Sequence, residues 1–135
     1  MQALDDLARL VGRLLVAALF LPSGVGKAMN LAGFTGMLAG KGVPFPEILA
    51  ILGAAAEIVG PILLILGLAP RITAVVVGGF CLVAALISHN FWTFTDEAAQ
   101  LAQRTQFLKN AAITGGMMFY FVSGSGRFSL GNGKY

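Results

Sequence analysis

Cysteine and histidine are almost absent from this chain. Among its 135 residues, Cys81 is the sole cysteine and His89 the sole histidine. A single cysteine excludes an internal disulfide, a CxxC redox pair and a c-type haem attachment motif. A single histidine excludes a bis-histidine haem within one chain, and one His with few acidic neighbours is a poor ligand set for a metal ion. The sequence therefore contains no haem or metal-binding motif.

Charge is also scarce. Asp, Glu, Lys and Arg make up 11% of the residues, and 57% are hydrophobic, whereas soluble domains carry about 25% charged residues. We therefore expect an integral membrane protein. The net charge of +3 is not gathered in a basic cluster suited to nucleic acid. No GxGxxG followed by an acidic residue is present, so nothing indicates a flavin or nucleotide cofactor.

Four apolar segments, each near the roughly 20 residues that cross a bilayer, dominate the chain. They predict an all-α fold, a four-transmembrane-helix antiparallel bundle, with spans at about residues 7–29, 48–68, 72–92 and 106–122. Asp5 and Asp6 spoil the basic start of a signal peptide, so we interpret the first segment as a retained anchor. No hydrophilic stretch is long enough for a second domain, and residues 1–135 are expected to form one.

The connecting segments are short. Leu31–Gly40 (LAGFTGMLAG) predicts a short amphipathic or re-entrant helix between the first two spans. Residues 95–105 predict a polar loop or short surface helix, because Asp96 and Glu97 suit a helix N-terminus. The Gly- and Ser-rich tail from Ser123 onward is expected to be peripheral.

Polar residues interrupt every span. A charge at the centre of a membrane helix costs about 2.5 kcal/mol or more, so such residues are usually paired and often functional. Counting along four antiparallel spans brings the main ones to the half of the bundle distant from the termini. Glu57 is the deepest, about ten residues or roughly 15 Å into its span. The set is Lys27, Glu57, His89, Asn90, Lys109 and Asn110.

Several stretches, in this order and spacing, resemble the DoxX family of small bacterial inner-membrane proteins over nearly the whole chain. They are RLLVAALFLPSGVGK at residues 13–27, GVPFP at 42–46, LGLAPRITA at 66–74, HNFW at 89–92, FLKNAAITGG at 107–116 and GSGRFSL at 124–130, with the mid-span acid Glu57. The resemblance implies a four-helix, multi-pass inner-membrane protein with an oxidoreductase role. One branch of the family is linked to quinone-coupled thiosulfate oxidation, and others to redox stress. No cofactor motif is shared across the family.

The residues and the resemblance together favour a redox-associated membrane subunit. Its polar cluster would hold a quinone or a similar apolar molecule with a polar head. Glu57 and His89 are the predicted catalytic groups, because they would exchange protons. Lys27 and Lys109 would stabilise a developing anion. Asn90, Asn110 and Trp92 complete the predicted ligand-binding set, and no metal site is predicted.

An oxidoreductase of this kind would need electrons from a protein partner, because the chain offers no carrier of its own. The lipid bilayer is also an expected partner, and a second copy of the chain is another candidate. Lys and Arg are slightly more frequent on the terminal side, so both termini are predicted to be cytoplasmic. The polar cluster would then lie in the outer half of the bundle.

Simpler interpretations stand beside this one. Glu57 can form a structural salt bridge with Lys27 or Lys109, and Trp92 can serve as an interface anchor. The protein would then be a non-enzymatic scaffold or assembly subunit of a larger complex. A small-solute transporter is a weaker alternative, since four spans without a repeat make too small a pathway unless the chain oligomerises. Arg13 is expected among headgroups, and Cys81 as a small buried hydrophobe.

Overall fold

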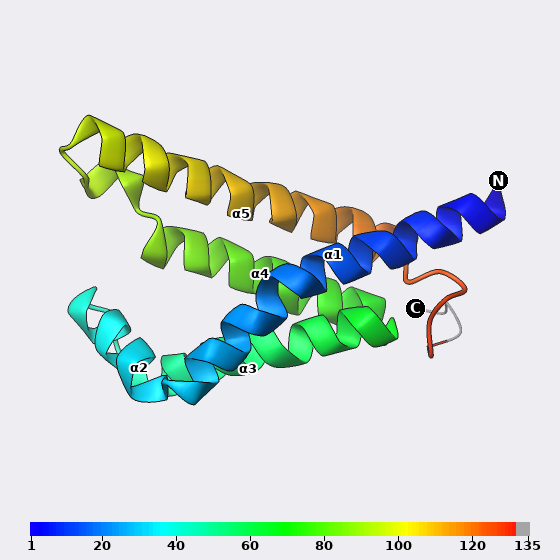
Figure 1. Ribbon diagram of the computed structural model, residues 1–135, viewed down its shortest axis with the longest axis horizontal. Coiled ribbons are helices and arrows are strands. Elements are labelled where there is room, and N and C mark those ends of the chain that lie inside the picture. The colour runs from blue at the N-terminus through cyan, green and yellow to red at the C-terminus, as the bar shows by residue number, and fades with distance from the viewer. Residues whose placement is uncertain (132–135) are drawn as a thin grey trace.

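The computed structural model describes residues 1–131, and within them all regular structure is helical (Figure 1). This confirms the all-α prediction. The elements are α1 (Gln2–Met29), α2 (Leu31–Gly40), α3 (Pro46–Leu66), α4 (Pro70–Ser88), the 3₁₀ turn η1 (Phe91–Thr93) and α5 (Glu97–Ser123).

Three of the four predicted spans are matched by helices long and apolar enough to cross a membrane. Over residues 1–131 these are Gln2–Met29, Pro46–Leu66 and Pro70–Thr93, the last including η1. The short helix predicted at Leu31–Gly40 is α2. α5 differs from the others because its first ten residues, 97–106, are largely polar, and it becomes predominantly apolar only from Ala111 onward.

The predicted polar segment at residues 95–105 is not a separate loop or short helix, because most of it forms the first turns of α5. α5 runs without interruption from Glu97 to Ser123. The Asp96 carboxylate accepts a hydrogen bond from the Ala99 backbone N–H at 2.8 Å, which caps the first turn as the acidic start predicts. Residues 97–114 contain no Gly or Pro to end the helix, so it continues into the apolar stretch.

The helices form two tight pairs rather than a closed bundle. α1 packs along α3, and α4 packs along α5, while α3 and α4 are joined by the turn at residues 67–69. Near this turn Gly60 faces Val77 closely enough that a Cβ at Gly60 would lie 2.7 Å from a Val77 methyl group. Figure 1 shows the two pairs diverging toward the opposite end, beside α2. We call this end the distal end.

The core lies where the two pairs meet, between the turn and the distal end. It contains the cluster Phe20, Leu64, Ala74, Val77, Cys81, Met117 and Tyr120. Cys81 is fully buried, which confirms the expectation of a small core residue. Large apolar side chains on the outward faces, such as Leu15, Ile51 and Val83, are exposed as they are where lipid covers a helix.

The C-terminal tail is packed against the helices, so the prediction of a peripheral tail is wrong for its described part. The Leu130 N–H donates to the Leu66 carbonyl at 2.9 Å, and Ser125 is fully buried. Residues 132–135, the end of the predicted tail, lie outside the described residues.

Arg13 is not at the headgroups as predicted, and is 2% exposed. Its guanidinium donates to the Phe128 carbonyl. The tail therefore supplies a buried acceptor for this cation. That partner stands 115 positions away in the sequence, so hydropathy along one helix cannot reveal it.

Candidate functional site

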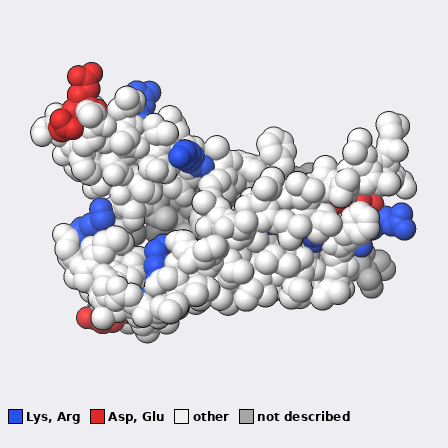
Figure 2. All heavy atoms as spheres, in the orientation of Figure 1, with Lys and Arg blue, Asp and Glu red and all other residues white. Residues whose placement is uncertain are grey.

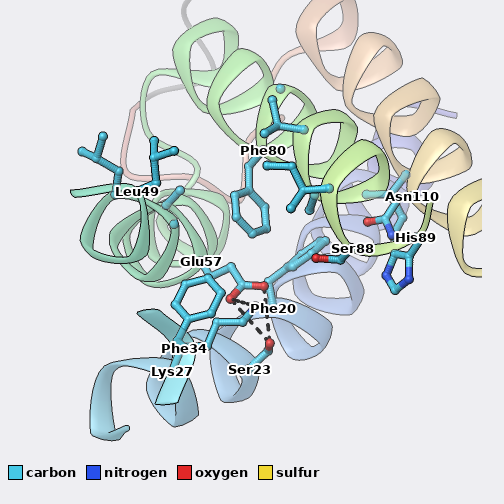
Figure 3. A pocket seen from close by; sticks show the side chains of 18 of the residues that line it. Phe20, Ser23, Lys27, Phe34, Leu49, Glu57, Phe80, Ser88, His89 and Asn110 are labelled. Atoms are coloured by element: carbon cyan, nitrogen blue, oxygen red, sulfur yellow. Dashed lines mark hydrogen bonds and ion pairs between the residues drawn. The ribbon is translucent and has the colours of Figure 1, made fainter. Parts of the chain in front are cut away.

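A cavity of about 1000 Å³ lies between the two helix pairs in the distal half of the molecule (Figures 2 and 3). α1, α2, α3, α4 and α5 all contribute to its lining. Figure 2 shows the hollow from outside, with Lys and Arg side chains on both sides of it. Most of the lining is apolar, and the polar side chains are concentrated on two walls.

The first polar wall is an ion pair between α1 and α3. The Lys27 Nζ lies 2.5 Å from Oε2 of Glu57. Glu57 is 4% exposed. The Ser23 hydroxyl donates to the same carboxylate, at 3.3 Å to Oε1 and 3.5 Å to Oε2. Figure 3 shows the three side chains converging at the cavity wall. The buried carboxylate thus has both a cation and a hydroxyl partner, as an acid in hydrocarbon requires.

The spacing of residues along α1 and α3 explains how this polar wall forms. Ser23 and Lys27 stand four residues apart, so they share one face of α1. Gly24 lies between them, and a Cβ there would be 2.7 Å from the Glu57 backbone. The missing side chain lets α1 approach α3 closely at the level of the acid. Pro61, one turn after Glu57, has no N–H to donate to the Glu57 carbonyl.

Two aromatic rings complete the surroundings of Lys27. Its Nζ lies 5.1 Å from the centroid of the Phe34 ring on α2 and 5.8 Å from that of Phe80 on α4. Both distances are within the range of cation–π attraction. The ammonium therefore contacts groups from three other helices, which explains how a lysine near the end of α1 comes to face inward.

The second polar wall is formed by the end of α4 and the middle of α5. It contains Ser88, His89, Gln106, Lys109 and Asn110. His89 Nδ1 lies 2.8 Å from Oε1 of Gln103. An amide oxygen can only accept a hydrogen bond, so Nδ1 is the donor in this contact. This hydrogen bond fixes the orientation of the imidazole at the cavity.

Lys109 and Asn110 complete this wall and differ in their partners. The Asn110 amide donates to the Gln106 carbonyl at 3.1 Å, within α5. Among residues 1–131, no carboxylate lies within ion-pair distance of Lys109. The second wall therefore carries a cation that is not neutralised by an acid of the described chain.

Most of the predicted site residues do come together. Lys27, Glu57, His89, Lys109 and Asn110 all line the cavity. Asn90 and Trp92 do not. The Asn90 carbonyl accepts from Thr93, and the Trp92 ring packs edge-on against Phe91 and Phe107, with centroids 5.3 and 6.0 Å away. Trp92 is about half exposed, in an aromatic cluster beside the cavity.

Sequence reasoning missed several lining or supporting residues. Ser23 was detectable, because it stands one turn before Lys27 on the same face. Gln103 and Gln106 fell in or beside a segment predicted as a loop or surface helix. Phe34 and Phe80 carry no polar signal, so their position around Lys27 could be seen only in three dimensions.

The chain is similar to known membrane proteins. The DoxX family profile matches residues 8–90, from α1 to just beyond α4. The chain belongs to the DoxX family. It is 31% identical to the inner membrane protein YphA of Escherichia coli K12 over 121 residues, 90% of this chain and 86% of YphA. It is 33% identical to the E. coli inner membrane protein YqjF over 131 residues, 96% of this chain and 94% of YqjF. No solved structure matches significantly.

These relatives and the apolar helices make this DoxX protein an integral membrane protein, and the curated relatives are inner-membrane proteins. Both relatives align over 86% or more of their length. The similarity therefore includes most of α5 and the α5 residues of the second polar wall, which lie beyond the family match at residues 8–90.

Proposed function

We propose that this DoxX protein is a redox-associated inner-membrane subunit that binds a small amphiphilic molecule of the quinone class in the distal cavity. The observation that supports this is the Lys27–Glu57 ion pair, which borders a cavity of about 1000 Å³ instead of being sealed between helices. Ligand sites are typically concave and mostly apolar, with a few convergent polar groups. The cavity has this composition.

The two polar walls suit the ends of such a molecule. Reduction of a quinone to a quinol consumes protons as well as electrons, and Glu57 and His89 are the cavity groups able to exchange protons. Lys27 and Lys109 would stabilise negative charge on a reduced ring oxygen. Electrons would be delivered by a partner protein, since the sequence has no carrier motif.

We further propose that α5 is the fourth span and that residues 1–135 form a single domain with both termini in the cytoplasm. α5 packs along α4 for much of its length (Figure 1). Its apolar second half accompanies α4, while its polar first half extends past the end of α4 at the distal end (Figure 1). The cavity would then open toward the periplasmic side.

A scaffold role is the second candidate. Lys27 contacts Glu57 on α3, Phe34 on α2 and Phe80 on α4. The same ion pair would therefore hold four helices together without any ligand. Under this proposal, removal of the acid would weaken the fold, and no bound small molecule would be found.

Native mass spectrometry of gently solubilised protein separates the two proposals. Wild type is compared with Glu57→Gln and with the matched control Glu47→Gln, which removes an exposed acid from the first turn of the same helix. A small molecule bound to wild type and Glu47→Gln, but depleted in folded Glu57→Gln, supports ligand binding. An empty chain in all three, or one bound only to a protein partner, contradicts it and favours the scaffold.

A further inference from the structure

We infer that the ligand of the distal cavity is an anionic amphiphile, with its acidic head at the α4–α5 wall and its apolar chain reaching the lipid between the two helix pairs. This deepens the proposed ligand site, and rests on it, by naming the charge of the head group and the direction of the chain. Within the quinone class only a reduced and deprotonated head is anionic, because the oxidised head is neutral.

The charge of the head follows from the balance of the lining residues. Lys27 and Glu57 are in direct contact, so their charges cancel locally. Lys109 is a second lining cation, with no carboxylate in ion-pair distance among residues 1–131. No other Asp or Glu occurs among the lining residues that the structure describes. The cavity thus has an excess positive charge, which an anionic head would neutralise.

The direction of the chain follows from which lining residues are exposed. Leu19 on α1, Leu52 on α3 and Val83 on α4 line the cavity, and each is more than 50% exposed. These large accessible apolar side chains are suited to contact with an apolar chain. α1 does not pack along α5, so the cavity is not closed on that side.

On α1, α4 and α5 the polar lining residues lie nearer the distal end than the apolar ones. Lys27, Ser88 and His89 stand at or near the distal ends of α1 and α4. Leu19 and Val76 lie two to three turns further from that end. A ligand with its head at the distal end and its chain directed toward the middle of the membrane is therefore oriented like the surrounding lipids.

A side chain introduced at Gly79 would fill part of the cavity without displacing the residues that line it. It lines the cavity, and a Cβ built on it meets no atom within 4 Å. Gly79→Leu would place an isobutyl group in the space that the chain occupies. Gly116 on α5 also has open space around its Cβ position but does not line the cavity. Gly116→Leu is therefore the matched control.

A second pair of variants tests the effect of the lining charge. Lys109→Gln removes the lining cation, whereas Lys41→Gln removes an exposed lysine at the end of α2 that does not line the cavity. Both changes lower the net charge equally. They differ only in whether the lost charge faces the ligand.

The experiment titrates delipidated, full-length protein with oleate and, separately, with oleyl alcohol in one detergent, read by native mass spectrometry. The two probes share a chain and differ in head-group charge. We expect wild type, Lys41→Gln and Gly116→Leu to prefer oleate by about threefold or more, a typical effect of one partly exposed ion pair. Lys109→Gln should lose the preference, and Gly79→Leu should lose most binding of both probes.

Equal binding of oleate and oleyl alcohol by wild type would overturn the inference about charge while leaving an amphiphile site intact. Gly79→Leu binding oleate as well as wild type would overturn the placement of the chain. If neither probe binds and no molecule co-purifies with wild type, the proposed ligand site itself is wrong.

Discussion

Gly24 on α1 lies directly against the backbone of Glu57 on α3. A Cβ at position 24 would stand 2.7 Å from the carbonyl carbon, carbonyl oxygen and Cβ of Glu57, closer than real Cβ contacts. The ion pair with Lys27 thus depends on a residue that makes no polar contact itself. Because Gly24 has no side chain, α1 can lie close to α3 at this level.

Gly24→Ala should therefore destabilise the protein by about 1–3 kcal/mol, the usual cost of overpacking a tight contact. α1 would have to move away from α3, which would lengthen the Lys27–Glu57 contact. The measurement is unfolding in detergent by denaturant or heat. Gly26→Ala is the control, because a Cβ there meets nothing within 4 Å. Equal stability of the two variants would contradict the prediction.

The Lys27–Glu57 pair should show energetic coupling. Glu57→Gln leaves the Lys27 cation without its acid, and Lys27→Met leaves a carboxylate that is 4% exposed without its cation. Each single change should lower the free energy of unfolding by more than half of the loss caused by the double change. This corresponds to a coupling free energy of about 0.5–3 kcal/mol between the two side chains. A double-mutant cycle on unfolding free energy measures this. Additive single effects would show that the contact contributes nothing to stability.

Arg13 should hold the C-terminal tail in place. Arg13→Met keeps most of the apolar stem but removes the donor to the Phe128 carbonyl. We expect a loss of about 1–3 kcal/mol and faster proteolysis within residues 124–131. Arg127→Gln, which alters an exposed side chain in the tail itself, is the control. A tail equally resistant in wild type and Arg13→Met would refute this role.

The proposed topology predicts the behaviour of C-terminal fusions. With α5 as a fourth span and a cytoplasmic N-terminus, a reporter active only in the periplasm should be inactive at the C-terminus, and a cytoplasmic fluorescent reporter should be bright. The same reporters inserted after Lys41, at the distal end, should give the opposite pattern. Periplasmic activity at the C-terminus would exclude the proposed arrangement.

Much of the site was predictable because membrane helices restrict geometry. Once the apolar segments are placed antiparallel, Lys27, Glu57, His89 and Lys109 must lie toward the same end, and the structure brings them to one cavity. The choice between Lys27 and Lys109 as partner of Glu57 was not predictable. It depends on the close approach at Gly24, a property of the packed helices rather than of either sequence segment.

Other features depended on contacts remote in sequence. The burial of Arg13 requires the tail carbonyl of Phe128, and the inward position of Lys27 requires rings from α2 and α4. The continuity of α5 was missed for a different reason. Polar residues at 97–106 suggest an exposed segment, but exposure does not end a helix that lacks Gly or Pro and is capped by Asp96.

The tie between the tail and the helices has a mechanical consequence. Leu130 bonds to the end of α3 and Phe128 to Arg13 near the middle of α1, so the tail that follows α5 is tied to both helices at the end opposite the cavity. α3 has 21 residues and is therefore a lever about 30 Å long. A rotation of about 4° at the tied end would change the distal separation by about 2 Å over that length. A small change of angle at the tied end would therefore change the width of the cavity at the opposite end of the molecule.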